Sequence, residues 1–141
     1  MIDSVDSLKL AVRLNEAAAK LEKKLPVLLE IKLSTEETKV GLDPHSSDAV
    51  QLLERLPDLA QLEVRGLMTI APLGVGDDGT RACFRALRTL RDRWAQAYPK
   101  LDFSVLSMGM SGDFPLAIAE GATRIRVGSA LFGARSYPVQ A

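Results

Sequence analysis

Apolar residues along the chain follow two spacings, one typical of amphipathic helices and one typical of buried strands. Four segments repeat apolar residues three and four apart, and short continuous apolar runs of strand length lie between them. The predicted helices cover residues 10–25, 49–56, 83–97 and 113–120. The predicted strands cover residues 27–33, 64–70, 103–107 and 125–127, with a short additional strand at 2–5.

Prolines and glycines set the expected ends of these elements. Pro26 is expected to end the first helix, and Pro57 the second. Residues 71–79, rich in Gly and Asp, are expected to form a loop. Gly121 stands where the C′ glycine of a helix belongs, and residues 131–133 open a final turn.

The strict alternation of helices and apolar strands predicts an α/β fold with one parallel sheet covered by helices. No low-complexity linker or change of composition divides residues 1–141, so we expect a single domain. Sheets of this kind bind ligands at the carboxyl ends of their strands. Here those ends are residues 4–6, 32–35, 68–72, 107–111 and 128–129.

Composition narrows the class of protein. The chain has 141 residues, of which 47% are apolar and 26% charged, as in a globular protein. Its formal net charge of zero gives no long-range attraction to nucleic acid or to an anionic membrane. No run approaches the roughly 20 apolar residues of a membrane span, and the first residues lack the pattern of a signal peptide. A single cysteine, Cys83, fits a reducing compartment, so we expect a cytoplasmic protein.

Two strand ends carry the small residues that suit a phosphate. Residues 106–111 read Leu-Ser-Met-Gly-Met-Ser and lead into a helix, and residues 126–129 read Arg-Val-Gly-Ser. Backbone N–H groups and hydroxyls at such corners hold phosphate without a P-loop. Gly109 would let the backbone approach a ligand closely, with Met108 and Met110 as an adaptable apolar wall.

Ser111 and Arg126 each have a second interpretation. Ser111 can cap the helix that begins near Asp113. Arg126 can point outward to a helix carboxylate such as Glu120, whereas an inward arginine needs an anion or an acceptor. The neighbouring Gly-Ser pair at 128–129 favours the inward arrangement and a binding site.

The other reactive side chains give weaker signals. Lys32 could form a Schiff base if desolvated, but a solvated lysine at the sheet rim is the commoner case. His45 has no partner at metal-ligand spacing, and residues 77–79 lack the further ligands of a calcium loop. Cys83 fits a core position, and the arginine-rich helix around it fits a solvated surface. We expect neither a metal site nor a catalytic triad.

Six blocks of the chain share one resemblance. They are residues 3–7, 36–41, 65–70, 84–92, 106–111 and 126–135. In order and spacing they resemble the pyridoxal phosphate homeostasis proteins, close relatives of the alanine racemase N-terminal barrel domain. The resemblance implies part of a (β/α)₈ TIM barrel, roughly strands four or five to eight. It also implies the cofactor pyridoxal 5′-phosphate (PLP) and a role in vitamin B6 homeostasis without turnover.

The resemblance also implies roles for particular residues. Ser107, Ser111 and the pair Gly128 and Ser129 would hold the phosphate, and Met68 would line the ring pocket. Arg126 would face the pyridine nitrogen and keep it unprotonated. The implied cofactor-binding set is Met68, Ser107, Gly109, Ser111, Arg126, Gly128 and Ser129, with no catalytic residue.

The chain departs from the family at the Schiff-base lysine. That lysine lies in an early Ala-Val-Ser-Lys-type segment, which is absent here, and Lys32 falls where relatives usually carry asparagine. We therefore expect the C-terminal part of such a protein (a fragment, a truncated gene model or half of a split gene) that binds PLP noncovalently.

Five strands of an eight-stranded barrel cannot close. We expect two exposed strand edges and an exposed apolar interior, leading to self-association, to pairing with a complementary N-terminal half, or to marginal stability. Two other functions stay open. One is a PLP enzyme such as an amino-acid racemase, for which Tyr98 and Tyr137 are poorly placed bases; the other is an α/β scaffold that binds no ligand.

Overall fold

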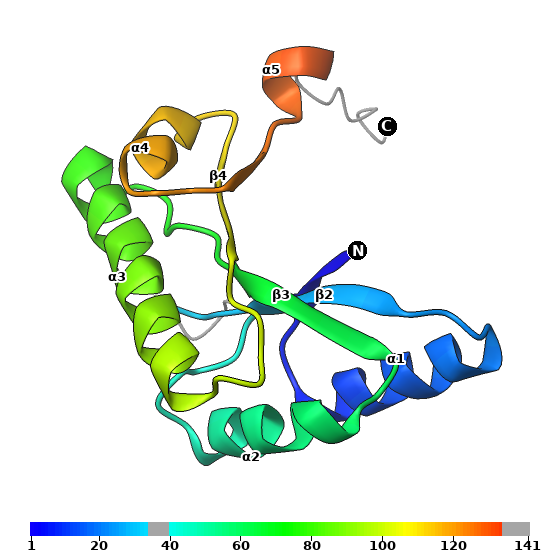
Figure 1. The fold of residues 1–141 in the computed structure, drawn as a ribbon. Coiled ribbons are helices and arrows are strands. Elements are labelled where there is room, and N and C mark those ends of the chain that lie inside the picture. The colour runs from blue at the N-terminus through cyan, green and yellow to red at the C-terminus, as the bar shows by residue number, and fades with distance from the viewer. Residues whose placement is uncertain (34–39, 134–141) are drawn as a thin grey trace, which may run out of the picture.

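A computed structural model describes residues 1–33 and 40–133, which form a parallel sheet of five strands with helices on one face (Figure 1). The strands lie side by side in chain order: β1 (Ile2–Val5), β2 (Leu25–Glu30), β3 (Leu62–Met68), β4 (Val105–Met110) and β5 (Arg124–Arg126). The helices are α1 (Leu8–Lys20), α2 (Ser47–Arg55), α3 (Gly76–Ala97), α4 (Phe114–Ala119) and α5 (Ser129–Phe132), with a 3₁₀ turn, η1, at Leu56–Asp58. The predicted α/β class and parallel pairing are confirmed.

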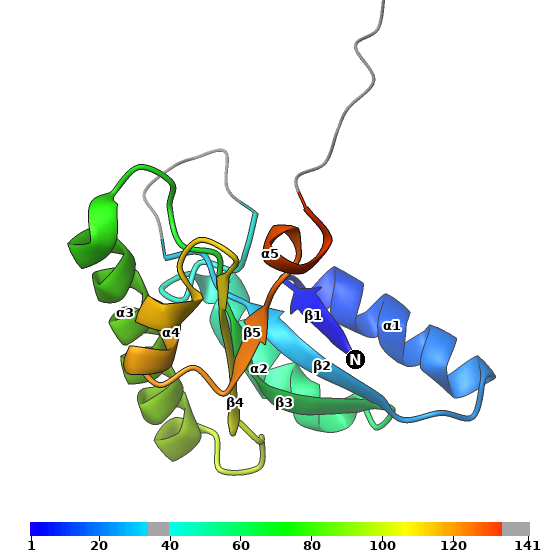
Figure 2. The same ribbon diagram turned by 90° about the horizontal axis from the view of Figure 1, so that it is seen from above.

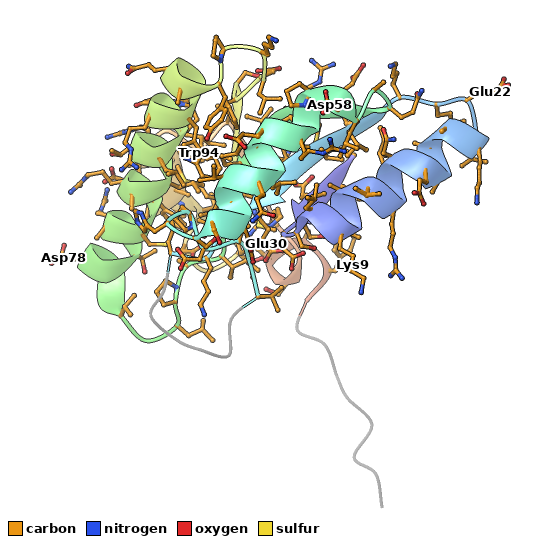
Figure 3. All side chains as sticks on the ribbon, turned by 90° about the horizontal axis from the view of Figure 1, so that it is seen from below. Lys9, Glu22, Glu30, Asp58, Asp78 and Trp94 are labelled. Atoms are coloured by element: carbon orange, nitrogen blue, oxygen red, sulfur yellow. The ribbon has the colours of Figure 1, made fainter. Side chains whose placement is uncertain are left out.

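The sheet is curved, and its convex face is covered by α1, α2 and α3. Figure 2 shows the curvature from above, and Figure 3 shows the three helices side by side from the opposite side. Alternate residues of β2 (Val27, Leu29) belong to the core between sheet and helices, together with Phe84 and Leu87 of α3. Because neighbouring strand residues point to opposite faces, Glu30 lies on the concave face.

Side chains on the concave face are more buried than we expect for five strands of an open barrel. Leu28 is fully buried, Met68 is 4% exposed and Glu30 is 8% exposed. Asp3 of β1 forms an ion pair of 3.2 Å with Arg124 of β5, so the curvature brings side chains of the two edge strands into contact. The expectation of an exposed apolar interior is therefore wrong at Leu28 and Met68.

Several predicted boundaries are also wrong. The first helix ends at Lys20, five residues before the expected end, because Glu22 has a positive φ of 50° and Pro26 lies in β2. The expected loop at 71–79 is helical from Gly76, because Asp77 and Asp78 in the first turn suit the positive end of a helix.

The predicted strand at 103–107 is instead β4, which continues to Met110. Some of the predictions concern residues that the structure does not describe. These are residues 34–35 at an expected strand end, most of the block 36–41, Arg135 and Tyr137.

Helix α4, which follows β4, is held against α3 by one carboxylate. Glu120 is 6% exposed. It accepts hydrogen bonds from Arg81 at 3.5 Å and from Arg85 at 3.1 and 3.3 Å, while the backbone carbonyl of Glu120 accepts one from Arg88 at 3.0 Å. The arginine-rich face of α3 is thus partly a docking surface for α4, rather than a purely solvated one. Gly121 has the positive φ of 96° expected for a C′ glycine.

Candidate functional site

The two predicted corners meet at the carboxyl ends of β4 and β5. The Ser111 hydroxyl oxygen accepts the backbone N–H of Gly128 at 3.2 Å and that of Ala130 at 3.1 Å. The N-cap of α4 is Asp113, whose carboxylate accepts the N–H of Met110 at 2.6 Å. The alternative in which Ser111 caps this helix is therefore wrong. Its hydroxyl instead joins the segment after β4 to the segment after β5.

Gly109 is required by packing against α4. Its φ is +91°, and a Cβ atom there would lie 2.5 Å from the Cβ of Ala117 and 3.0 Å from the Cα of Phe114. Met108 is fully buried in the core, so its predicted role in the wall of a pocket is wrong; Met110 is 44% exposed. The glycine thus lets the strand and the helix approach each other closely.

Arg126 points into the concave side of the sheet. Its Nη1 donates to both the carbonyl and the hydroxyl oxygen of Ser107 at 3.0 Å, and its Nη2 donates to the Thr69 carbonyl at 3.0 Å. The outward arrangement toward Glu120 is wrong, because the arginines of α3 bind that carboxylate. Three bonds leave two of the five guanidinium N–H groups, on Nε and Nη2, with no partner in the described part of the chain.

Carboxylates surround the Arg126 guanidinium. Burial lowers the pKa of Arg126, while Asp3, Glu30 and Asp113 raise it. Burial, and then the charge of Asp6, raise the pKa of Glu30, while Arg126 lowers it. An arginine stays protonated in proteins, so the concave face carries a fixed cation among acidic side chains.

Ser107 and Met68 lie deeper in the sheet than Ser111. Ser107 is fully buried, and its hydroxyl donates to Asp3 at 3.2 Å while it accepts from Arg126. Met68 is paired in register with Glu30 on one side and Ser107 on the other. The phosphate role implied for Ser107 stays a prediction.

The remaining candidates lie apart from this arrangement. Lys32 is half-buried just beyond β2, and Cys83 belongs to the core as predicted. The His45 N–H donates to Asp43 in a turn. Tyr98 is the C-cap of α3 and packs against the core. Across residues 1–33 and 40–133, no three His, Cys, Asp or Glu side chains gather as a metal site, and no helix could span a membrane.

Three residues of the site were missed by reasoning from the sequence. Asp3 and Thr69 lie within blocks quoted above, but nothing in their spacing marks them as partners of Ser107 and Arg126. Glu30 carried a usable signal, because it is the one charge inside the apolar run 27–31. A lone acidic residue in a buried strand indicates a cationic partner on a neighbouring strand.

Comparison with known proteins gives a consistent set of relatives. Residues 2–136 match the family model for the alanine racemase N-terminal domain. The chain is 41% identical over 137 residues to a pyridoxal phosphate homeostasis protein of Aquifex aeolicus, covering 97% of this chain and 59% of that protein. It is 44% identical over 135 residues to one of Synechocystis, covering 95% of this chain and 60% of that protein.

Solved structures agree with this result. PipY of Synechococcus elongatus, solved with PLP bound, is 46% identical with a TM-score of 0.81, covering 93% of this chain and 59% of PipY. D-threonine aldolase of Filomicrobium marinum, 22% identical with a TM-score of 0.71, shares the fold over 97% of this chain and 39% of the aldolase. The chain thus spans about three-fifths of the length of the Aquifex, Synechocystis and Synechococcus relatives.

Proposed function

Since the chain belongs to the alanine racemase N-terminal domain family, we propose that it binds PLP at the carboxyl ends of β4 and β5 and serves PLP homeostasis without turnover. Relatives at about 40% identity are named pyridoxal phosphate homeostasis proteins, and PipY holds PLP. The observation that carries the proposal is the contact of Ser111 with Gly128 and Ala130, because it brings two sets of phosphate donors to one corner.

The corner fits a phosphate group chemically. The N–H groups of Gly128 and Ala130 converge on one oxygen, that of Ser111, and a phosphate oxygen would accept these N–H groups in place of the Ser111 oxygen. The hydroxyls of Ser111 and Ser129 add two more donors. Apart from the chain neighbours of Gly128, no atom of the described residues lies within 4 Å of the position of a Cβ on this glycine, so that side of the corner has room.

Arg126 and Met68 suit the ring end of the same ligand. The two N–H groups of Arg126 that have no partner within residues 1–33 and 40–133 can donate to the pyridine nitrogen, and a guanidinium there holds that nitrogen unprotonated. An unprotonated ring is a poor electron sink, which favours storage of PLP over catalysis on it. Met68, next to Ser107 in register, would supply apolar contact to the ring.

The decisive experiment is a PLP titration of the 141-residue chain, followed by absorbance, with two variants. Ser111→Ala removes a hydrogen bond to a charged group, so we expect affinity to fall by about ten- to a hundredfold. Ser104→Ala is the matched control, because Ser104 is exposed and precedes the start of β4. Wild-type protein that binds no PLP, or equal affinity in both variants, would contradict the proposal.

We also propose that PLP binds noncovalently, with Lys32 taking no part. Reduction of the PLP complex with borohydride should leave the mass of the protein unchanged. A covalent adduct on Lys32 in the mass spectrum would overturn this assignment. The strands are proposed to correspond to strands four or five through eight of the family's barrel.

The outer edges of β1 and β5, which pair with no other strand of the described residues, suggest association. They are the two outer strands of the sheet, and parallel edges left open are templates for further strands. We propose that they pair with a second copy or with a complementary polypeptide. Sedimentation and thermal melting over a range of protein concentrations test this, and a two-state monomeric melt at micromolar concentration argues against it.

A further inference from the structure

We propose that Ser107 is a positioning residue: with Asp3 it fixes the guanidinium of Arg126 for the ring end of the ligand, and it does not touch the phosphate. This inference rests on the proposed function and assigns Ser107 and Asp3 to a part of the site to which nothing above assigns them. It follows from three observations about the concave face.

The first observation is the saturation of the Ser107 hydroxyl. Ser107 is fully buried between Leu106 and Met108 of β4. Its hydroxyl donates its only proton to Asp3 at 3.2 Å and accepts from Arg126 at 3.0 Å. A phosphate oxygen needs a donor, and this hydroxyl has none left to give.

The second observation is distance along the strand. Residues 107 to 110 all lie in β4, and a regular strand rises about 3.3 Å per residue, so Ser107 lies at most roughly 10 Å below the end of the strand, whose pairing with β5 is irregular over this stretch. The phosphate donors lie beyond that end, at Ser111 and Gly128. A phosphate group held by Ser111 would therefore lie four residues beyond Ser107 along the chain.

The third observation is how firmly Arg126 is held. Its Nη1 is fixed by two oxygens of Ser107 and its Nη2 by the carbonyl of Thr69. The Ser107 hydroxyl is itself oriented by Asp3, which is held in turn by Arg124 at 3.2 Å. These contacts run from β1 through β4 to β5. They fix the orientation of the guanidinium, and with it the direction of the two remaining N–H groups of Arg126.

The test compares two ligands that form no imine with lysine, pyridoxine 5′-phosphate and pyridoxine, in calorimetric titrations of the full chain. Ser107→Ala should weaken both by the same factor, about tenfold. Asp3→Asn keeps the shape of a partly exposed side chain and should weaken both by a smaller equal factor. Ser111→Ala should weaken only the phosphorylated ligand, and Asp102→Asn, in an exposed ion pair with Arg65, should change neither.

A spectroscopic signature separates positioning from a general loss of structure. The absorbance of bound pyridoxine 5′-phosphate reports the protonation of its ring nitrogen, and it should shift in Ser107→Ala but not in Ser111→Ala. Loss of affinity for the phosphorylated ligand alone in Ser107→Ala would make Ser107 a phosphate ligand and overturn the inference, as would unchanged binding of both ligands. Wild-type protein that binds neither ligand would overturn the proposed function itself, a result distinct from these.

Discussion

Replacing Gly109 with alanine tests whether this glycine serves packing or the ligand. The residue has a φ of +91°, which L-residues rarely adopt, and its missing Cβ would lie 2.5 Å from the Cβ of Ala117. The Cβ of Ala117 is fixed to the backbone of α4 and is not the end of a flexible side chain, so strand β4 or helix α4 must move. The substitution therefore combines backbone strain with overpacking at the corner that carries Ser111.

Both effects lower the stability of the folded state. A strained φ costs about 1–3 kcal/mol and overpacking of a tight contact about 1–3 kcal/mol, so Gly109→Ala should lower the free energy of unfolding by roughly 2–6 kcal/mol. That loss is a large part of the about 5–15 kcal/mol of a typical domain. Urea unfolding followed by circular dichroism measures it.

Gly112→Ala is the matched control, because no atom lies within 4 Å of its Cβ position. The additional change Ala117→Gly removes the nearest contact of Gly109→Ala, so the double variant should recover part of the overpacking term despite about 1 kcal/mol of lost helix propensity. The reasoning fails if Gly109→Ala is as stable as Gly112→Ala. It also fails if Gly109→Ala keeps full stability and loses PLP, since glycine would then serve the ligand.

Three further substitutions test other parts of the structure. Bonding to Arg85 lowers the pKa of Glu120 from its ordinary 4.5, so the charged form stabilises the fold above pH 4.5 and this stability is lost as the pH falls through the lowered pKa. Glu120→Gln should remove that pH dependence from unfolding curves between pH 7 and pH 3. Burial raises the pKa of Glu30 above 4.5, so the fold loses stability as the pH rises from 4.5 through the raised value. Glu30→Gln should therefore gain stability relative to wild type at pH 7 but not at pH 4, and an equal difference at both would contradict this. Gly66→Ala would place a Cβ 1.9 Å from the carbonyl oxygen of Val105, and melting should show it to be less stable than Gly112→Ala.

Periodicity predicted the order and type of the strands and of the four longer helices, because burial on one face imposes a repeat that the sequence displays. The family resemblance is also confirmed, by the match over residues 2–136. The predicted ends of helices and strands are wrong where they rest on a single proline or glycine. Pro26 lies in β2 and does not end a helix, and Gly109, beyond the predicted end of its strand at residue 107, lies within β4.

The partners of the site residues could not be predicted, because they depend on the curvature of the sheet. Ser107 and Asp3 are 104 residues apart, and their contact requires that β1 and β4, which are not neighbours, face each other across the concave side. Ser111 was ambiguous for a related reason. A serine before a helix suits a cap as well as a ligand, and only the position of Gly128, whose N–H donates to Ser111, shows that Ser111 does not cap the helix.

The two ends of the proposed ligand would be held by parts of the protein that respond differently to change. The phosphate corner consists of backbone N–H groups and hydroxyls beyond the strand ends, so it depends on how the segments after β4 and β5 lie against each other. The ring end would depend on Arg126, which is half-buried and is held by Ser107 and, through Ser107, by Asp3 of an edge strand. A change at the β1 edge should therefore weaken binding of the ring more than binding of the phosphate. For that reason, the state of pairing at this edge is a physical route by which association could alter how tightly the ring is held.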